Sequence, residues 1–159
     1  MEHKEITRSI IGAAMAVLNE LKPGLEERLY ENALVLELTT RGHTVQQQLQ
    51  YAVHYRSQLV GTLIPDLIID GKVLADAKVV SALTQTHLAQ MLGYLTVTRL
   101  EVALLLNFKE STLAWRRVVR GGVAPVRPPG AAGAAPTLLP AASALSSMAE
   151  MSPAQQLPN

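Results

Sequence analysis

The stretch LIPDLIIDGKVLADAKVV, residues 63–80, reads as two strands joined by an Asp-Gly turn, and three charged residues interrupt the otherwise almost wholly apolar strand segments. They are Asp66, Asp76 and Lys78, and an unpaired charge buried in a sheet costs several kcal/mol or shifts its pKa. Carboxylates are ligands that Mg²⁺ and Mn²⁺ prefer, and bound phosphates complete the coordination shell. An ammonium group beside them reduces their repulsion, and it can orient a water or stabilise charge that develops on a phosphate. The three residues therefore suggest a site for a divalent cation, although a surface hairpin with solvated charges also fits.

The strand that carries Asp76 and Lys78 is expected to lie in the centre of a sheet. Side chains alternate between the two faces of a strand, so Asp76 and Lys78 share one face. The remaining residues of both faces are mainly apolar, as they are in strands that are covered on both sides. The first face holds Leu74, Asp76, Lys78 and Val80, and the second holds Val73, Ala75, Ala77 and Val79.

The Asp-Gly turn between the two strands decides whether Asp66 can meet Asp76. A two-residue loop places the two acids on opposite faces. A three-residue loop that ends with Gly71 in the left-handed region pairs Ile68 with Lys72. Asp66 then lies diagonal to Asp76 on the same face, about 7–8 Å away at the backbone. We predict the three-residue loop, which permits a shared cation.

Hydrophobic periodicity predicts an α/β fold with helices on both faces of a sheet. A Leu29–Ala33–Leu36 stripe is expected to form the apolar face of the second helix, with Leu34 and Leu38 beside it and Gly42 as its C-terminal cap. Thr84 is expected to cap the start of the third helix. The predicted helices span about residues 6–21, 25–41 and 84–97, and the predicted strands span about 45–55, 58–69, 72–80, 100–108 and 111–119.

Composition indicates a folded domain over residues 1–120 and a disordered Ala- and Pro-rich tail over residues 121–159. The whole chain has 48% apolar residues and a net charge of +1, so no global attraction to nucleic acid is expected. It has no cysteine, which excludes disulfides and thiolate metal sites. The N-terminus lacks the long apolar segment of a signal peptide, and no uncharged apolar run approaches the ~20 residues of a membrane span. We therefore expect a cytoplasmic protein without a membrane partner.

Several segments resemble known nucleases. Pro65-Asp66 followed by Asp76-Ala77-Lys78 resembles the PD-(D/E)xK motif. GLEERLYENALVLELTTRGHTVQQQ is similar to the opening of the GxxExxY family, with Gly24, Glu27 and Tyr30 on the named pattern, and the likeness continues to about residue 119. The resemblance implies a restriction-endonuclease-like core, with a mixed central sheet flanked by helices and the acid-acid-lysine trio at its centre. Asp76 stands where this family more usually has Glu.

The resemblance also implies roles for the residues. A metal-dependent nuclease of this kind would bind Mg²⁺ or Mn²⁺ through Asp66, Asp76 and the Ala77 carbonyl, with Glu27 assisting. Lys78 would position the attacking water. Glu27 also has an ordinary explanation, because negative charge is favoured in the first turn of a helix.

Polar residues on two helices are further candidates. Gln90 and Tyr94 have a Gln-x-x-x-Tyr spacing that resembles a motif placed beside the active site in some members of the superfamily, and a solvated helix rim is the alternative. Tyr30 could support the site or only pack at the edge of the core. His87 is expected to lie at a helix start rather than to bind metal.

The expected partner is DNA or RNA, approached through local contacts. Few residues are aromatic, so base stacking is not expected to be strong. A catalytically inactive module that binds nucleic acid or a protein partner, or forms a homodimer, remains an alternative function, as does a metal enzyme of another class. Five basic residues could supply a rim for phosphates or could be solvated charges at strand ends, and Arg116 and Arg117 are expected on opposite faces of a strand, where they form no single patch. The five are Arg99, Lys109, Arg116, Arg117 and Arg120.

Overall fold

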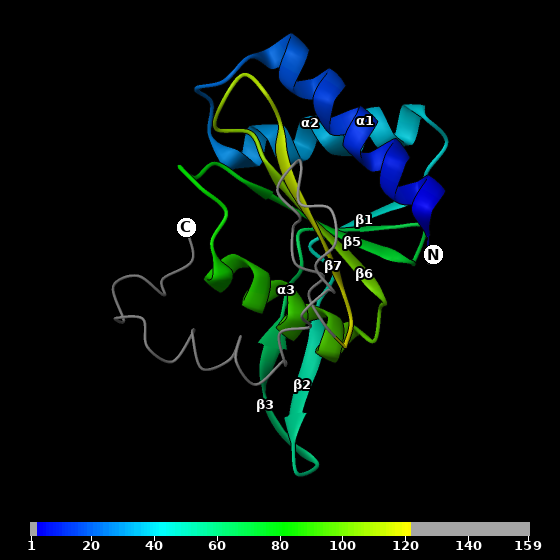
Figure 1. The fold of residues 1–159 in the computed structure, drawn as a ribbon. Helices are drawn as coiled ribbons and strands as arrows, with labels where there is room; N and C mark the ends of the chain where they lie inside the picture. Colours follow the sequence, from blue (N-terminus) through cyan, green and yellow to red (C-terminus); the bar gives the residue numbers. More distant parts are fainter. Residues whose placement is uncertain (1–2, 122–159) are drawn as a thin grey trace, which may run out of the picture.

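The computed structural model describes residues 3–121, which fold around a five-stranded mixed sheet with helices on both faces (Figure 1). The strand order is β1-β4-β5-β6-β7; β5 and β6 run parallel, and the other neighbours are antiparallel. This confirms the predicted fold class. The helices are α1 (Lys4–Leu21), α2 (Glu27–Thr40) and α3 (Gln85–Thr98), and the strands are β1 (Val45–Gln47), β2 (Tyr51–Tyr55), β3 (Gln58–Leu63), β4 (Leu67–Ile69), β5 (Val73–Lys78), β6 (Val102–Asn107) and β7 (Ala114–Val119).

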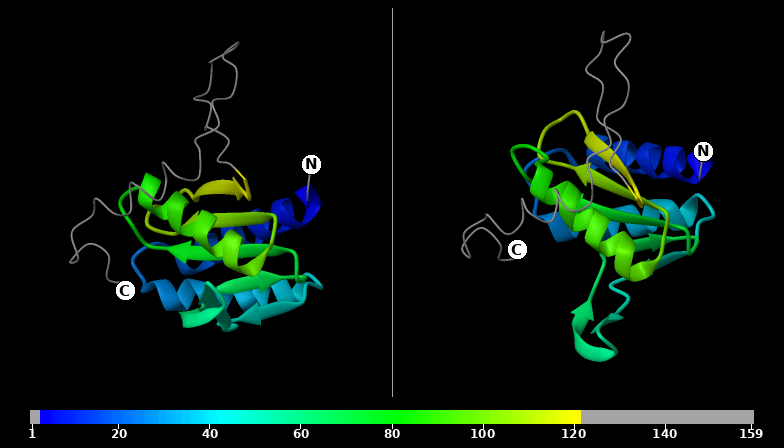
Figure 2. Two further views of the ribbon diagram at one scale, coloured as in Figure 1. Left: turned by 90° about the horizontal axis from the view of Figure 1, so that it is seen from below. Right: turned by 60° about the horizontal axis from the view of Figure 1, so that its bottom comes forward.

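Two hydrophobic clusters cover the two faces of the sheet. One packs α1 and α2 against Val73, Ala75 and Ala77 of β5, and the other packs α3 against Leu74. Strand β5 is therefore central and covered on both sides, as predicted. The crossover from β5 through α3 to β6 supplies the long connection that two parallel strands require (Figure 2).

Helix α1 confirms its predicted extent, but the predicted apolar stripe of α2 is wrong. Leu29 and Leu36 are exposed, Leu36 to 72%. The buried side of α2 carries Tyr30 together with Leu34 and Leu38, the two leucines expected beside the stripe, at a spacing of four residues. Helix α2 has apolar residues on two sides, and only the Tyr30 side meets both α1 and the sheet. Periodicity alone cannot choose between two such sides.

Two of the predicted strands are each divided in two. The predicted strand 45–55 consists of β1 and β2, and the predicted strand 58–69 consists of β3 and β4. The breaks follow from the backbone: Gln48 has a left-handed φ of 58°, and Pro65 has no N–H to donate to a ladder. Strands β2 and β3 pair only with each other and form a separate hairpin.

The β4–β5 turn has the predicted length but a different position. Its three loop residues are Asp70, Gly71 and Lys72, because Ile69 pairs with Val73. The predicted pairing of Ile68 with Lys72 is wrong. Both Asp70 and Gly71 have positive φ, of 54° and 65°, so the left-handed conformation begins one residue earlier than expected.

This register changes how the two acids meet. Leu67 pairs with Ala75 in this antiparallel pair. The residue before Leu67 and the residue after Ala75 are therefore opposite each other, so Asp66 faces Asp76 directly rather than diagonally. An odd number of loop residues keeps both acids on one face, which is the part of the prediction that holds.

Thr84 precedes α3, as predicted, and its backbone N–H donates to His87 Nδ1 at 2.9 Å. The predicted tail lies outside the described residues from residue 122 onward. Within residues 3–121, no helix combines the length and apolarity needed to cross a membrane.

Candidate active site

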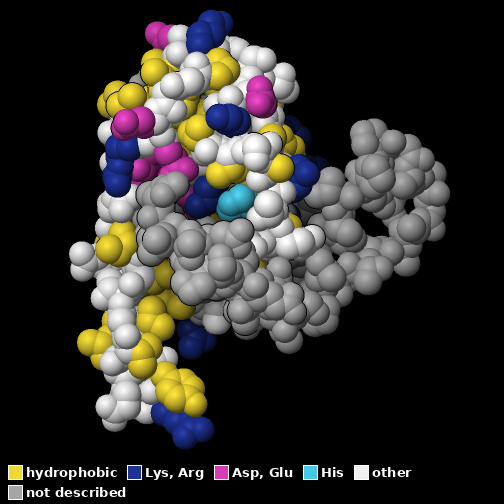
Figure 3. Space-filling view, turned by 90° about the vertical axis from the view of Figure 1, so that its left-hand side faces the viewer, with side chains coloured by type: hydrophobic (Ala, Val, Ile, Leu, Met, Phe, Trp, Pro, Cys, Tyr) yellow, Lys and Arg dark blue, Asp and Glu magenta, His cyan; other side chains and the backbone are white. Residues whose placement is uncertain are grey.

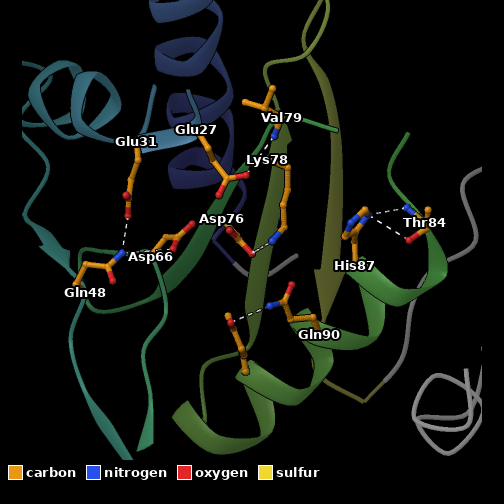
Figure 4. A network of polar contacts seen from close by, with 11 residues as sticks. Glu27, Glu31, Gln48, Asp66, Asp76, Lys78, Val79, Thr84, His87 and Gln90 are labelled. Atoms are coloured by element: carbon orange, nitrogen blue, oxygen red, sulfur yellow. Dashed lines mark hydrogen bonds and ion pairs between the residues drawn. The ribbon is translucent and has the colours of Figure 1, made fainter. Parts of the chain in front are cut away.

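The site lies where β4 separates from β5. Pairing between these strands ends at Leu67 and Ala75, so Asp76, Ala77 and Lys78 have only β6 as a paired neighbour. Pro65 and Asp66 leave the sheet there, and the N-terminus of α2 closes the other side. Figure 4 shows the carboxyl groups of Asp66, Asp76 and Glu27 pointing toward a common space.

Asp76 is one of two deeply buried acids in the group, since it and Glu31 each have 3% of the residue exposed. Its carboxylate forms an ion pair with Lys78, whose Nζ lies 3.3 Å from Asp76 Oδ2. Burial raises the pKa of Asp76 well above its ordinary value, and a hydrogen bond and repulsion from Asp66 raise it further. The two carboxyl groups thus lie close enough to share a cation.

Lys78 stays a cation in this setting. Burial alone would lower the pKa of Lys78, but the carboxylates of Asp76, Glu27 and Asp66 outweigh it and raise the pKa above the ordinary value. A lysine held protonated cannot accept a proton, so it acts by charge and by donating hydrogen bonds.

Glu27 and Glu31 add two acids from α2. Glu27 Oε1 accepts the backbone N–H of Val79 at 3.2 Å, which ties the start of α2 to the end of β5. The pKa of Glu27 is raised, mainly by burial. Attraction to Lys78 lowers this pKa and repulsion by Asp66 raises it, and neither reverses the effect of burial. Burial likewise raises the pKa of Glu31, with Asp66 as the second cause.

Gln48 links an acid of α2 to the acid that precedes β4. Its side-chain amide donates to Glu31 Oε1 at 2.9 Å and to Asp66 Oδ1 at 3.4 Å, and its backbone N–H donates to the Asp66 carbonyl at 3.0 Å. The left-handed backbone of Gln48 turns the side chain inward. Gln48 therefore holds Asp66 in place.

Neither Gln48 nor Glu31 was singled out from the sequence. Glu31 lies one turn after Glu27, so its i+4 spacing was a usable signal. Gln48 is one of three consecutive glutamines, and nothing in the sequence separates it from its neighbours.

The group carries more negative than positive charge. It holds four acids, and two cations lie among them: Lys78, and Arg28, whose Nη1 is 3.3 Å from Glu31 Oε2. A pocket of about 550 Å³ opens beside the acids. Its lining residues are Glu26, Glu27, Arg28, Glu31, Gln48, Asp66 and Val79.

The other predicted site residues lie around this centre or away from it. Gln90 Nε2 donates to the Tyr94 hydroxyl at 2.9 Å. Burial raises the pKa of Tyr94, and the negative charge of Asp76 raises it further. Tyr94 on α3 is therefore close enough to interact electrostatically with the site. His87 lies at the start of α3, as expected, where burial and Lys78 lower its pKa.

Tyr30 lies in the core. It is fully buried, its ring stacks on Phe108 at 4.8 Å, and its hydroxyl donates to the Lys22 carbonyl at 2.6 Å and accepts the Leu25 N–H at 3.1 Å. These bonds hold the turn that leads into α2, and so they help to position Glu27 from a distance.

The predicted basic rim is only partly available. Arg120 is paired with Glu101, and Arg116 donates to the Trp115 carbonyl. Leu104 pairs with Arg117 and Leu105 with Arg116, so the two arginines alternate between faces of β7 and form no single patch.

A metal ion fits the centre of the site on chemical grounds. Within residues 3–121, no three side chains of His, Cys, Asp or Glu are grouped so that they could hold a metal by themselves. Mg²⁺, however, is usually bound by one or two carboxylates, waters and substrate phosphates rather than by an all-protein cage. The facing carboxyls of Asp66 and Asp76, with the Ala77 carbonyl between Asp76 and Lys78, form a hard-oxygen set of that kind.

Comparison with known proteins agrees with this geometry. The model of the PD-(D/E)XK nuclease superfamily matches residues 4–118, so the chain belongs to that superfamily. Its members generally use divalent metal ions. Neither the curated proteins nor the solved structures contain a match to this chain.

Proposed function

We propose that this protein is a metal-dependent nuclease that hydrolyses phosphodiester bonds of DNA or RNA, and that it belongs to the GxxExxY group of the superfamily. The observation that carries the proposal is the surplus of carboxylates around one ammonium group at the open end of β5. Four acids surround Lys78 and Arg28, and such a surplus favours a divalent cation.

We assign the metal to Asp66, Asp76 and the Ala77 carbonyl, with Glu27 on the side of α2. When bound, Mg²⁺ or Mn²⁺ would supply Lewis-acid chemistry, polarising the phosphate and lowering the pKa of a water. A cation held between the two carboxyl groups would offset the repulsion from Asp66 that helps to raise the pKa of Asp76. The requirement for two ionised carboxylates makes metal affinity fall as the pH is lowered.

Lys78 acts on the phosphate. Its cationic ammonium group orients the attacking water and stabilises the negative charge that develops as the water oxygen bonds to phosphorus. The P–O bond to the leaving group then breaks; the attacking water gives its proton to solvent, and the leaving oxygen takes a proton from solvent. Gln90 and Tyr94, bonded to each other on α3, support this side of the site.

The direct test is cleavage of single-stranded and duplex DNA and RNA in Mg²⁺ or Mn²⁺. We expect the wild type to cleave at least one substrate and Asp76→Ala and Lys78→Ala to lose that activity. Leu36→Ala is the matched control, because its side chain is exposed on α2. A wild type that cleaves none of these substrates in either metal would falsify the proposal.

A non-catalytic module is the second candidate. It is favoured because, within residues 3–121, no three metal-ligating side chains are grouped closely enough to hold a metal by themselves. Calorimetry with Mn²⁺ separates the two functions, because the nuclease must bind the ion and an inactive module need not.

A further inference from the structure

The β2–β3 hairpin projects from the body of the domain as a ribbon of two strands (Figures 1 and 2). Its two-residue turn, Arg56-Ser57, has positive φ at both positions, which is the geometry that closes a tight hairpin. The base of β2 touches α3. Two-stranded hairpins are marginally stable in water on their own, so a partner would stabilise this one.

The outer part of the hairpin exposes apolar and aromatic side chains. Tyr55, Leu59 and Val60 are exposed to 61%, 67% and 61%. Figure 3 shows hydrophobic side chains along the projecting part of the molecule. Large exposed apolar side chains that gather in one place mark contact surfaces.

The charge of the hairpin differs from that of the active site. Residues 49–65 contain no Asp or Glu, and Arg56 is the sole Lys or Arg among them. The guanidinium of Arg56 lies over the ring of Tyr55, 5.2 Å from its centroid. The tip therefore offers an aromatic surface with one positive charge, and it does not repel a polyanion.

The position of the hairpin determines which ligand it meets. Gln48 stands just before β2 and Asp66 just after β3, and the N–H of Gln48 donates to the carbonyl of Asp66. The chain segments that enter and leave the hairpin thus both carry active-site residues. A phosphate bound in the site would therefore lie beside the base of the hairpin, within reach of a nucleic-acid chain that continues along it.

The chemistry of the tip favours unpaired bases. A duplex is gripped mainly through cations that neutralise its phosphates, and one arginine supplies little of that. Exposed aromatic and apolar side chains stack on base faces, which are accessible in single strands and hidden in a duplex. Two of the four tyrosines, Tyr51 and Tyr55, lie on this hairpin, so stacking is stronger here than the aromatic content of the chain suggests.

We infer that the β2–β3 hairpin binds unpaired nucleotides next to the scissile phosphate, with a base on Tyr55 and Arg56, and so selects single-stranded DNA or RNA. The inference rests on the proposed nuclease function. From Gln48 to Arg56 is eight residues, which spans at most about 26 Å at about 3.3 Å per residue. That length corresponds to about eight stacked nucleotides at about 3.4 Å each.

The test is a length series of fluorescein-labelled oligothymidylates of 4, 8, 12 and 16 nucleotides, with Ca²⁺ in place of Mg²⁺ to limit cleavage. We expect wild-type affinity to rise about tenfold or more between the 4-mer and the 12-mer, as one stacked base would provide. The double variant Tyr55→Ala/Arg56→Ala should lose this rise and bind the 4-mer as the wild type does. Arg8→Ala, on α1, is the charge-matched control.

Each other outcome has a definite meaning. A double variant that keeps the full length dependence overturns the role of the hairpin and leaves the nuclease proposal standing. Equal losses for a blunt 12-base-pair duplex overturn the preference for single strands. A change from dimer to monomer in sedimentation, with unchanged oligonucleotide affinity, shows that a second copy covers the hairpin. A wild type that neither binds nor cleaves any nucleic acid overturns the proposed function together with this inference.

Discussion

Asp70 and Asp76 lie six positions apart on one hairpin, and their surroundings are opposite. Asp70 lies in the turn, where Oδ2 is 2.7 Å from His43 Nδ1 and Oδ1 accepts the N–H of Thr44 at 2.9 Å. His43 Nε2 in turn lies 2.7 Å from the hydroxyl of Ser9 on α1. Asp70 thereby ties the turn to the connection between α2 and β1, and through His43 to α1.

The two pKa shifts have opposite signs. Desolvation alone would raise the pKa of Asp70, but its hydrogen bonds to His43 and Thr44 outweigh this and lower the pKa below 3.8. At Asp76, burial and the neighbouring Asp66 raise the pKa, and the attraction of Lys78 does not cancel them.

The opposite pKa shifts indicate that ionised Asp70 stabilises the fold and that ionised Asp76 destabilises it. The native surroundings of Asp70 favour its charged form, whereas those of Asp76 disfavour it. A buried acid whose pKa is raised beside a second acid and a cation is typical of a functional site. Substitutions at the two positions should therefore have opposite consequences.

The largest effect is expected for Asp76→Asn, which keeps the shape of the side chain and removes its charge. We expect nuclease activity to fall by about a hundredfold or more, because the variant loses a carboxylate proposed to hold the metal, and with it the charge stabilisation that the metal would supply. The free energy of unfolding at pH 7 should stay the same or increase, because a disfavoured charge is gone. Cleavage assays and urea denaturation measure the two quantities. A variant that is both active and destabilised would place Asp76 with Asp70 as a structural acid.

For Asp70→Asn we expect the reverse. Asparagine tolerates the left-handed backbone at this position, and it loses the charge that strengthens the bonds to His43 and Thr44. The free energy of unfolding should fall by about 1.5 kcal/mol, with cleavage by the folded protein unchanged. Denaturation and cleavage measured below the unfolding transition test this. A loss of activity in the fully folded variant would contradict the division between the two acids.

The sequence could predict the same-face arrangement of Asp66, Asp76 and Lys78 because alternation along a strand and an odd loop length determine it. It could not predict the register, because loops centred on Ile69, Asp70 or Gly71 have the same parity. The departure of β2 and β3 from the sheet depends on the left-handed backbone of Gln48, a conformation that its residue type does not signal.

A smaller effect should follow from Gln48→Asn, which tests whether the buried acids need to be positioned. Asn accepts the left-handed backbone, but its side chain is one methylene too short to bridge Glu31 and Asp66. We expect affinity for Mn²⁺ to fall by about tenfold, as for other residues that orient metal ligands. Titration calorimetry measures the affinity directly, independent of turnover. Gln47→Asn, on the neighbouring exposed residue, is the control, and equal affinities for the two variants would exclude the positioning role.

The smallest effect, and the sharpest form of the comparison, is the pH dependence of stability. For Asp76, the raised folded-state pKa means that the native state keeps its proton longer than the unfolded state does. Its contribution to stability is therefore greatest below pH 3.8 and is lost as the pH rises through the folded-state pKa. For Asp70, the contribution is present above pH 3.8 and is lost as the pH falls through the lowered folded-state pKa. Urea denaturation of the wild type and both Asn variants between pH 3 and pH 8, without metal, should show the Asp70→Asn deficit closing toward acid pH. The free energy of unfolding of Asp76→Asn should increase relative to that of the wild type as the pH rises. If the differences between variant and wild type had the same pH dependence for both variants, the two acids would occupy equivalent environments.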